Sequence, residues 1–151
     1  MDNPLLNLLQ NTLEREMPIT RAMGIVVASF ENGQLAMRMP LEPNRNHQYS
    51  AFAGSLNALC TVVGWGTVFL LLQQESLPGN IVIRRGRIRY LRPVRTQEFI
   101  ATGLSIPGDE LGYFFELLRS KGRSKMDVSV DIADDKGPYV HFTGSYVVQD
   151  T

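Results

Sequence analysis

Residues 51–75 read AFAGSLNALCTVVGWGTVFLLLQQE, and this stretch decides the fold. No charged side chain lies between Gln48 and Phe69, and about 20 such residues are enough to cross a bilayer. Amide and hydroxyl side chains and several glycines dilute its hydrophobicity, however, and Glu75 follows it where a basic flank would be needed. We therefore predict a buried helix over about 51–75 and no membrane span.

Segments on both sides of this helix carry the patterns of further helices and strands. Leucines at helical spacing follow a possible cap, Asp2 or Asn3, and Pro18 ends that helix. Asn32-Gly33 predicts a tight hairpin turn, and strict alternation of apolar and polar side chains over 125–132 predicts a strand with one wet face. The expected elements are helix 3–17, strands 23–30 and 35–39, helix 51–75, strands 80–92 and 97–105, helix 108–120, and strands 125–132 and 138–148.

The order of these elements predicts an α+β fold. Strands arranged around one apolar helix favour a largely antiparallel sheet of five or six strands wrapped around it, within a single domain of residues 1–151. Because the helix is apolar on nearly every side, we expect one sheet to cover only part of it. A second subunit would hide the rest, so the sequence predicts a homodimer or a dimer of dimers.

Composition argues against several classes of partner. Fifteen basic and fifteen acidic residues cancel, so the net charge favours neither nucleic acid nor a membrane surface. Cys60 is the only cysteine, and its apolar surroundings make a reactive thiolate unexpected. Cys60 and the two histidines, His47 and His141, do not have the spacing of metal ligands, so no metal site is expected. The single cysteine and the lack of a signal-peptide pattern at the N-terminus predict a cytoplasmic protein.

One narrow stripe of the long helix differs from the rest. At 100° per residue, Gly54, Asn57, Thr61, Gly64 and Val68 lie within a quarter-turn of one another, and all are small or polar. A neighbouring strand or helix packed closely over the glycines would explain this stripe. A ligand lying across the first half of the helix would also explain it, with unpaired N–H groups near residues 51–54 offered to a carbonyl oxygen.

Two further stretches carry polar groups that could bind a ligand. Asn46 and His47 lie in the polar loop before the helix, where a histidine is more often a surface residue than a base. Arg85, Arg87 and Arg89 point to one side of an expected strand, while Gly86, Ile88 and Tyr90 point to the other. These arginines are either a solvated strand face or contacts for phosphate groups, to which the guanidinium is well matched. His141, in the last strand, is expected to face solvent or a polar edge.

The residues of the loop, the helix and the following strand resemble those of hotdog-fold thioesterases. In the phenylacetate-pathway type, a loop asparagine precedes a His-Gly-Gly turn that opens the helix, and a carboxylate follows two turns later. Here Phe52-Ala53-Gly54 occupies the place of that turn, and Thr61 occupies the place of the acid. Tyr90-Leu91-Arg92-Pro93-Val94 is similar to the Tyr-Leu-x-Pro-Val segment after the helix. Asn46-His47, 51–56 and Gly64-Trp65 are most similar to the YiiD C-terminal-domain thioesterase family.

This resemblance implies an acyl-thioester hydrolase that acts on acyl-coenzyme A or on an acyl-carrier protein. It implies catalytic roles for Asn46, His47 and Thr61, with coenzyme A entering only as part of the substrate and no other cofactor. The implied substrate-binding residues are Phe52, Ala53, Gly54, Asn57, Arg85, Arg87 and Arg89. Because Thr61 lacks the basicity of the carboxylate that it replaces, a domain that binds acyl thioesters or fatty acids without cleaving them is the alternative.

Overall fold

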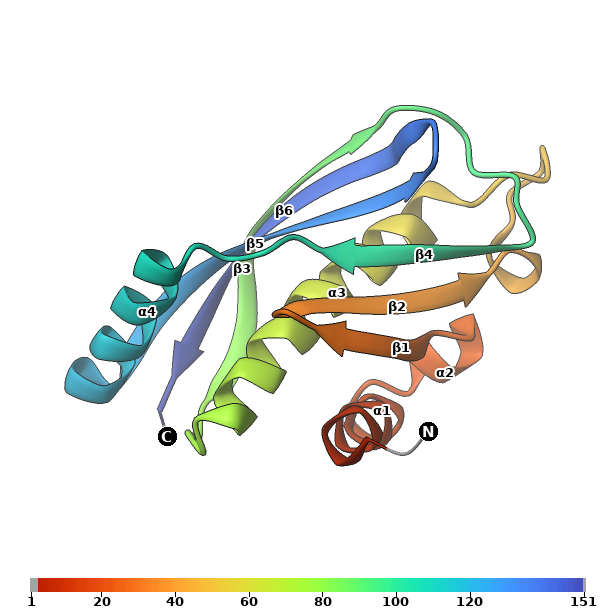
Figure 1. The fold of residues 1–151 in the computed structure, drawn as a ribbon. Coiled ribbons are helices and arrows are strands. Elements are labelled where there is room, and N and C mark those ends of the chain that lie inside the picture. Colours follow the sequence, from red (N-terminus) through yellow and green to blue (C-terminus); the bar gives the residue numbers. More distant parts are fainter. Residues whose placement is uncertain (1–2, 151) are drawn as a thin grey trace.

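A computed structural model describes residues 3–150 and shows a hotdog fold: one antiparallel sheet of six strands curves around a long central helix (Figure 1). The spatial order of the strands is β1-β2-β4-β5-β6-β3, so β1 and β3 form the two edges. This confirms the predicted α+β class and the wrapped helix. The elements are α1 (Pro4–Glu16), α2 (Ile19–Met23), β1 (Val26–Glu31), β2 (Gln34–Pro40), η1 (Glu42–Asn44), α3 (Ala53–Gln74), β3 (Asn80–Tyr90), β4 (Glu98–Gly103), α4 (Gly108–Lys121), β5 (Arg123–Asp134) and β6 (Gly137–Gln149).

Helix α3 is the centre of the core. Twelve of its 22 residues are buried in the single chain, among them Leu59, Val63 and Leu70 without any exposed surface. The helix is long and apolar enough to span a bilayer, but 67% of the relevant window is buried beneath the sheet. Its apolar composition therefore follows from its position in the core. The inner sheet face covers only part of the helix, as expected, and α1 adds further cover within the same chain.

Three local sequence signals, for a turn, a strand and a helix cap, are confirmed. Asn32 and Gly33 both have positive φ values, 54° and 75°, as the tight turn between β1 and β2 requires. In β5, Met126, Val128 and Val130 are buried, whereas the intervening polar side chains face the outside of the sheet. Asn3 caps α1 by accepting from the Leu5 N–H at 3.0 Å, and Asp2, the other predicted cap, lies outside the described residues.

The segment before β1 differs from the prediction. A strand was expected from residue 23, but Ile19–Met23 forms the short helix α2 and the strand begins at Val26. Pro18 precedes this helix, and Gly24 ends it in the left-handed conformation at φ 78°. Proline before the first turn and glycine after the last turn are typical of helix boundaries, so a signal for α2 was present in the sequence.

Candidate active site

Helix α3 begins with two backbone N–H groups that have no acceptor. Phe52 is extended, with φ −64° and ψ 131°, and no side chain caps the helix. The N–H groups near residues 51–54 were expected to be free, but two of them are paired. The Ala51 N–H donates to the Val94 carbonyl at 2.8 Å, and the Phe52 N–H donates to the Asn44 carbonyl at 2.7 Å. Within residues 3–150, no acceptor lies within hydrogen-bonding distance of the Ala53 and Gly54 N–H groups. These two donors, at the positive end of the helix dipole, are available to an oxygen atom of a ligand.

The surface around these donors is formed by the first two turns of α3 and the end of β3. Phe52 is 56% exposed, and Ala53, Gly54 and Asn57 are also exposed. Tyr90, at the end of β3, donates from its hydroxyl to the Ala53 carbonyl at 3.2 Å, which ties the strand to the start of the helix. The structure therefore brings four predicted substrate-binding residues of the loop–helix junction together on one accessible face.

The stripe of small and polar residues divides into two halves with different roles. Gly64 lies beneath Tyr146 of β6, since a Cβ atom at Gly64 would lie only 2.5 Å from Tyr146 Cζ. Val68 is fully buried. In contrast, Gly54 and Asn57 are exposed, and a Cβ atom at Gly54 would meet only the side chain of Phe52. Close packing thus explains the second half of the stripe, and an accessible surface remains at the first half.

Thr61 lies at the boundary between the two halves. Its hydroxyl donates to Asn57 Oδ1 at 3.4 Å, one helical turn earlier. Its carbonyl accepts a hydrogen bond of 2.8 Å from the Tyr146 hydroxyl. Burial raises the pKa of Tyr146, so this phenol stays protonated and acts as a donor. Thr61 is therefore positioned rigidly, with its hydroxyl beside the Asn57 amide.

Asn46 and His47, predicted to be catalytic, lie in a small loop closed by a bridge between Arg45 and Ala51. Asn46 organises this loop: its Oδ1 accepts from the N–H groups of Gln48 at 2.8 Å and Ser50 at 3.2 Å, and its Nδ2 donates to the Ser50 hydroxyl at 2.9 Å. His47 is exposed, and within residues 3–150 its ring makes no hydrogen bond. The Asn46 side chain thus has a structural role that the sequence did not indicate.

The two acidic residues that flank α3 in the sequence are engaged elsewhere. Glu42, in η1, forms an ion pair with Arg45 at 3.4 Å. Glu75 follows the other end of α3, where it pairs with Arg119 at 2.7 Å. At 1.5 Å per residue, the 21 residues from Gly54 to Glu75 correspond to about 31 Å along the helix axis. Neither acid is therefore placed to act at the exposed N–H groups in this chain.

The three arginines of β3 lie on the opposite face of the sheet from α3. In the β3–β6 register, Arg85 pairs with Ser145 and Arg89 with His141, on the outer face. Gly86, Ile88 and Tyr90 point inward, as the alternation predicted. His141 also faces outward, which confirms its expected exposure, and its Nδ1 lies 2.6 Å from Asp131 Oδ1. The start of α3 and these arginines therefore lie on opposite faces of the sheet.

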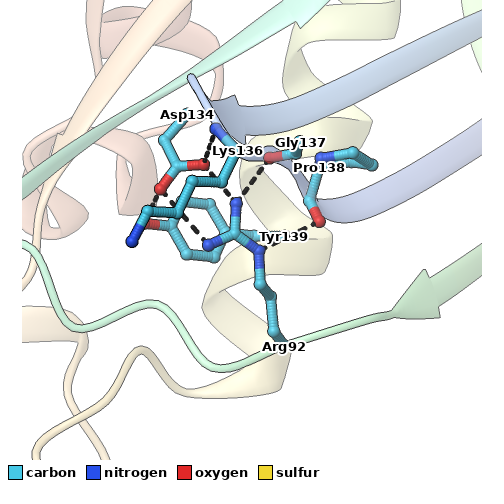
Figure 2. A network of polar contacts seen from close by, with 6 residues as sticks. All are labelled: Arg92, Asp134, Lys136, Gly137, Pro138 and Tyr139. Atoms are coloured by element: carbon cyan, nitrogen blue, oxygen red, sulfur yellow. Dashed lines mark hydrogen bonds and ion pairs between the residues drawn. The ribbon is translucent and has the colours of Figure 1, made fainter.

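Arg92, in the segment similar to that of thioesterases, locks the β5–β6 hairpin to the connection after β3 (Figure 2). Its guanidinium pairs with both oxygens of Asp134, donates to the Gly137 carbonyl at 2.6 Å and stacks 3.9 Å above the Tyr139 ring. Its hydrogen bonds hold the pKa of Asp134 well below its usual range. The sequence analysis missed this network because Arg92 and Asp134 lie 42 positions apart.

Cys60 lies in the buried part of α3. It has no exposed surface, and burial raises the pKa of its thiol to about 12. The expectation of an unreactive thiol therefore agrees with its environment. Within the described range 3–150, no group of three or more His, Cys, Asp or Glu side chains is arranged to hold a metal ion.

A six-stranded sheet wrapped around one central helix, with donors exposed where that helix begins, defines a hotdog protein of the thioesterase type. Residues 6–150 match the family model described as "Putative thioesterase (yiiD_Cterm)", and the chain belongs to this thioesterase family. The family predicted from the loop and helix residues is thus confirmed.

Solved structures agree with this assignment. The chain is 32% identical to a protein from Shewanella oneidensis described as the putative thioesterase, with a TM-score of 0.86 over 97% of this chain and 98% of that one. A protein of unknown function from Chlorobaculum tepidum gives a TM-score of 0.93 at 28% identity, over 97% and 95% of the two chains. A thioesterase from Haemophilus influenzae, at 17% identity and a TM-score of 0.74 over 99% and 93%, shares the fold.

Proposed function

We propose that the protein hydrolyses acyl thioesters carried by coenzyme A or by an acyl-carrier protein, at the exposed start of α3. The observation that carries this proposal is the pair of unpaired N–H groups at Ala53 and Gly54, with the Asn57 amide one turn away. Backbone donors at a helix start stabilise negative charge on a carbonyl oxygen as it develops in the transition state. Membership of a thioesterase family supports the same reaction.

The chemistry then follows from the groups around these donors. A water molecule attacks the thioester carbon while the carbonyl oxygen accepts from the two N–H groups. The Asn57 amide donates to this water, and the Thr61 hydroxyl, already donating to Asn57 Oδ1, accepts from it. The C–S bond breaks, the leaving sulfur takes up the proton lost by water to become the free thiol, and the carboxylic acid is released. Asn46 holds the preceding loop in shape, and His47 at its tip contacts the incoming substrate.

Neither Glu42 nor Glu75 is placed to act at the donors, which favours one alternative, a domain that binds acyl thioesters or fatty acids without cleaving them. A general base typically contributes about 10² to 10⁴ in rate, and threonine cannot serve as one near neutral pH. We therefore expect slow hydrolysis if the protein is active. Thr61→Asp places a carboxylate at this position and separates the two functions.

The test uses purified protein, a panel of acyl-coenzyme A and acyl-pantetheine thioesters, and release of free thiol as the readout. We expect hydrolysis by the native protein, its loss in Asn57→Ala, and faster turnover in Thr61→Asp. Asn11→Ala, which removes an exposed amide from α1, is the matched control and should leave the rate unchanged. Thermal melting of each variant shows whether the buried charge or the lost amide has affected folding.

Binding of a non-hydrolysable thioester analogue decides between the two functions. Tight binding without thiol release, in both the native protein and a folded Thr61→Asp, would favour the binding domain. If neither hydrolysis nor analogue binding responds to Asn57→Ala, the site does not lie at the start of α3.

We also propose that two copies of the chain pair through β3. This strand of 11 residues is a sheet edge, and two of its side chains are strongly exposed, Val82 at 59% and Tyr90 at 48%. The unpaired N–H and C=O groups of an edge strand are a template for pairing with another chain. Two such edges related by a two-fold axis would continue the sheet and bring the two α3 starts near one interface, where an acyl chain could lie. Sedimentation at micromolar concentration should show a dimer or a dimer of dimers, and a stable monomer would refute this pairing.

A further inference from the structure

The outer face of the sheet carries a groove away from the exposed start of α3. It runs over β3, β6 and β5, has a volume of about 410 Å³ and contains Arg85, Arg87, Arg89, Lys125 and Ser145. Its volume lies within the range of small-molecule sites, about 300 to 1,000 Å³. It lies on the side of the sheet opposite α3, because the inward neighbours of these arginines face the helix. Its chemistry can therefore be considered independently of hydrolysis.

Positive charge in this groove is not neutralised by the protein. Within residues 3–150, Arg85, Arg87 and Arg89 form no ion pair, whereas the nearby acids Asp127 and Asp131 are paired with Lys125 and His141. Successive arginines are two residues apart on one strand face, which corresponds to about 6.7 Å. In a protein with no net charge, such a row is a local excess that suits a ligand with more than one negative group.

A buried hydroxyl in the groove is also without a partner. Ser145 is only 9% exposed, and no atom of the described protein accepts from or donates to its Oγ. In the sheet it lies between Arg85 of β3 and Asp127 of β5, and it lines the groove. A buried polar group without a hydrogen bond destabilises a protein unless something else satisfies it. A bound anion beside Arg85 would accept a hydrogen bond from the Ser145 hydroxyl and supply the missing partner.

We propose that this groove binds the diphosphate group of a small molecule; where that molecule is coenzyme A, the proposal rests on the proposed thioester hydrolysis. Arg85, Arg87 and Arg89 donate to the phosphate oxygens, for which the planar guanidinium is well suited, and Ser145 Oγ donates from the floor. The diphosphate belongs either to the nucleotide end of coenzyme A or to a free nucleoside diphosphate. A concave site with a buried donor favours such a ligand over the flatter surface of an acidic protein.

The test is calorimetric titration of the whole protein with inorganic pyrophosphate, ADP and coenzyme A, none of which requires hydrolysis. We expect binding that weakens as salt is raised. Arg87→Gln should lower the affinity about tenfold to a hundredfold, as expected for loss of a charge-assisted hydrogen bond. Arg21→Gln is the matched control, because Arg21 is an exposed arginine of α2, remote from the groove and outside every ion pair formed by the described residues.

Ser145→Ala gives a signature that a structural role would not produce. It should weaken pyrophosphate binding several-fold while leaving the melting temperature of the free protein unchanged or raised, because the alanine variant no longer buries an unpaired hydroxyl. A fall in melting temperature with unchanged affinity would overturn the role of Ser145. Absence of pyrophosphate binding in the native protein, or binding indifferent to both groove variants, would overturn the site itself.

The same variants distinguish the two sources of the diphosphate. If coenzyme A is the occupant, Arg87→Gln raises KM for acyl-coenzyme A but leaves acyl-pantetheine hydrolysis unchanged. If a free nucleotide is the occupant, ADP binding is lost without any change in either KM. Both results support a diphosphate site. An altered sedimentation rate without altered diphosphate binding would instead show that this face contacts another copy of the chain, and would refute the proposal.

Discussion

Replacing Gly64 with alanine tests whether close packing by Tyr146 explains the second half of the α3 stripe. The new Cβ atom would lie 2.5 Å from Tyr146 Cζ and 2.6 Å from Cε1, far inside the 3.5 to 4.0 Å that carbon atoms prefer. Tyr146 has no exposed surface, so its ring cannot turn toward solvent. It must shift within the core and lose its hydrogen bond to the Thr61 carbonyl.

The expected magnitude follows from three contributions. Overpacking costs about 1 to 3 kcal/mol. Loss of the hydrogen bond from Tyr146 costs about 0.5 to 1.5 kcal/mol. Replacing glycine by alanine inside a helix returns about 1 kcal/mol. The free energy of unfolding of Gly64→Ala should therefore fall by about 0.5 to 3.5 kcal/mol relative to the native protein.

The assay is urea unfolding followed by circular dichroism, at one protein concentration because association would contribute to stability. Gly112→Ala in α4 is the matched control: its Cβ meets nothing within 4 Å, so it should gain up to about 1 kcal/mol. Gly54→Ala should remain within about 1 kcal/mol of the native protein, because the exposed Phe52 ring can turn away. The reasoning is refuted if Gly64→Ala is stabilised like Gly112→Ala.

Two further predictions concern the ionisable groups. Because the pKa of Asp134 is lowered in the folded state, its stabilising effect is complete well above the ordinary carboxyl pKa of about 4 and declines as the pH falls toward the lowered value. Asp134→Asn should therefore melt below the native protein at pH 7, with a difference that shrinks below about pH 4; a difference that is constant with pH would contradict this. Cys60 should not react with a thiol reagent at pH 8 until the protein unfolds, because its thiol is buried and protonated; stoichiometric labelling of the native protein would disprove it.

Local patterns in the sequence were sufficient for most of the fold. The uncharged apolar run predicted α3 to within two residues at its start, because a helix without a polar face can be stable only in a core. Asn32-Gly33 specified its turn because both residues tolerate positive φ. The alternation in β5 specified which side chains face the helix. Each of these properties depends on neighbouring residues, so one sequence is enough to reveal it.

The candidate site was predicted only in part. The stripe on α3 indicated that something approaches the helix closely, but the residues alone left packing and ligand binding open. Tyr146, which lies above Gly64, is 85 positions from the carbonyl that it binds. Only the folded sheet brings it there, and that contact separates the packed half of the stripe from the accessible half.

The arginines of β3 show the same division between what the sequence and the structure determine. Alternation along β3 predicted that Arg85, Arg87 and Arg89 share one side, yet it contained no information on which side faces α3. The pairing of β3 with β6 decided that they face outward, next to the buried Ser145. The sequence thus determined the elements and their apolar faces, through local periodicity and turn chemistry. Strand pairing between distant segments decided which polar groups meet, because hydrogen bonds and close packing across the sheet depend on contacts that no local pattern contains.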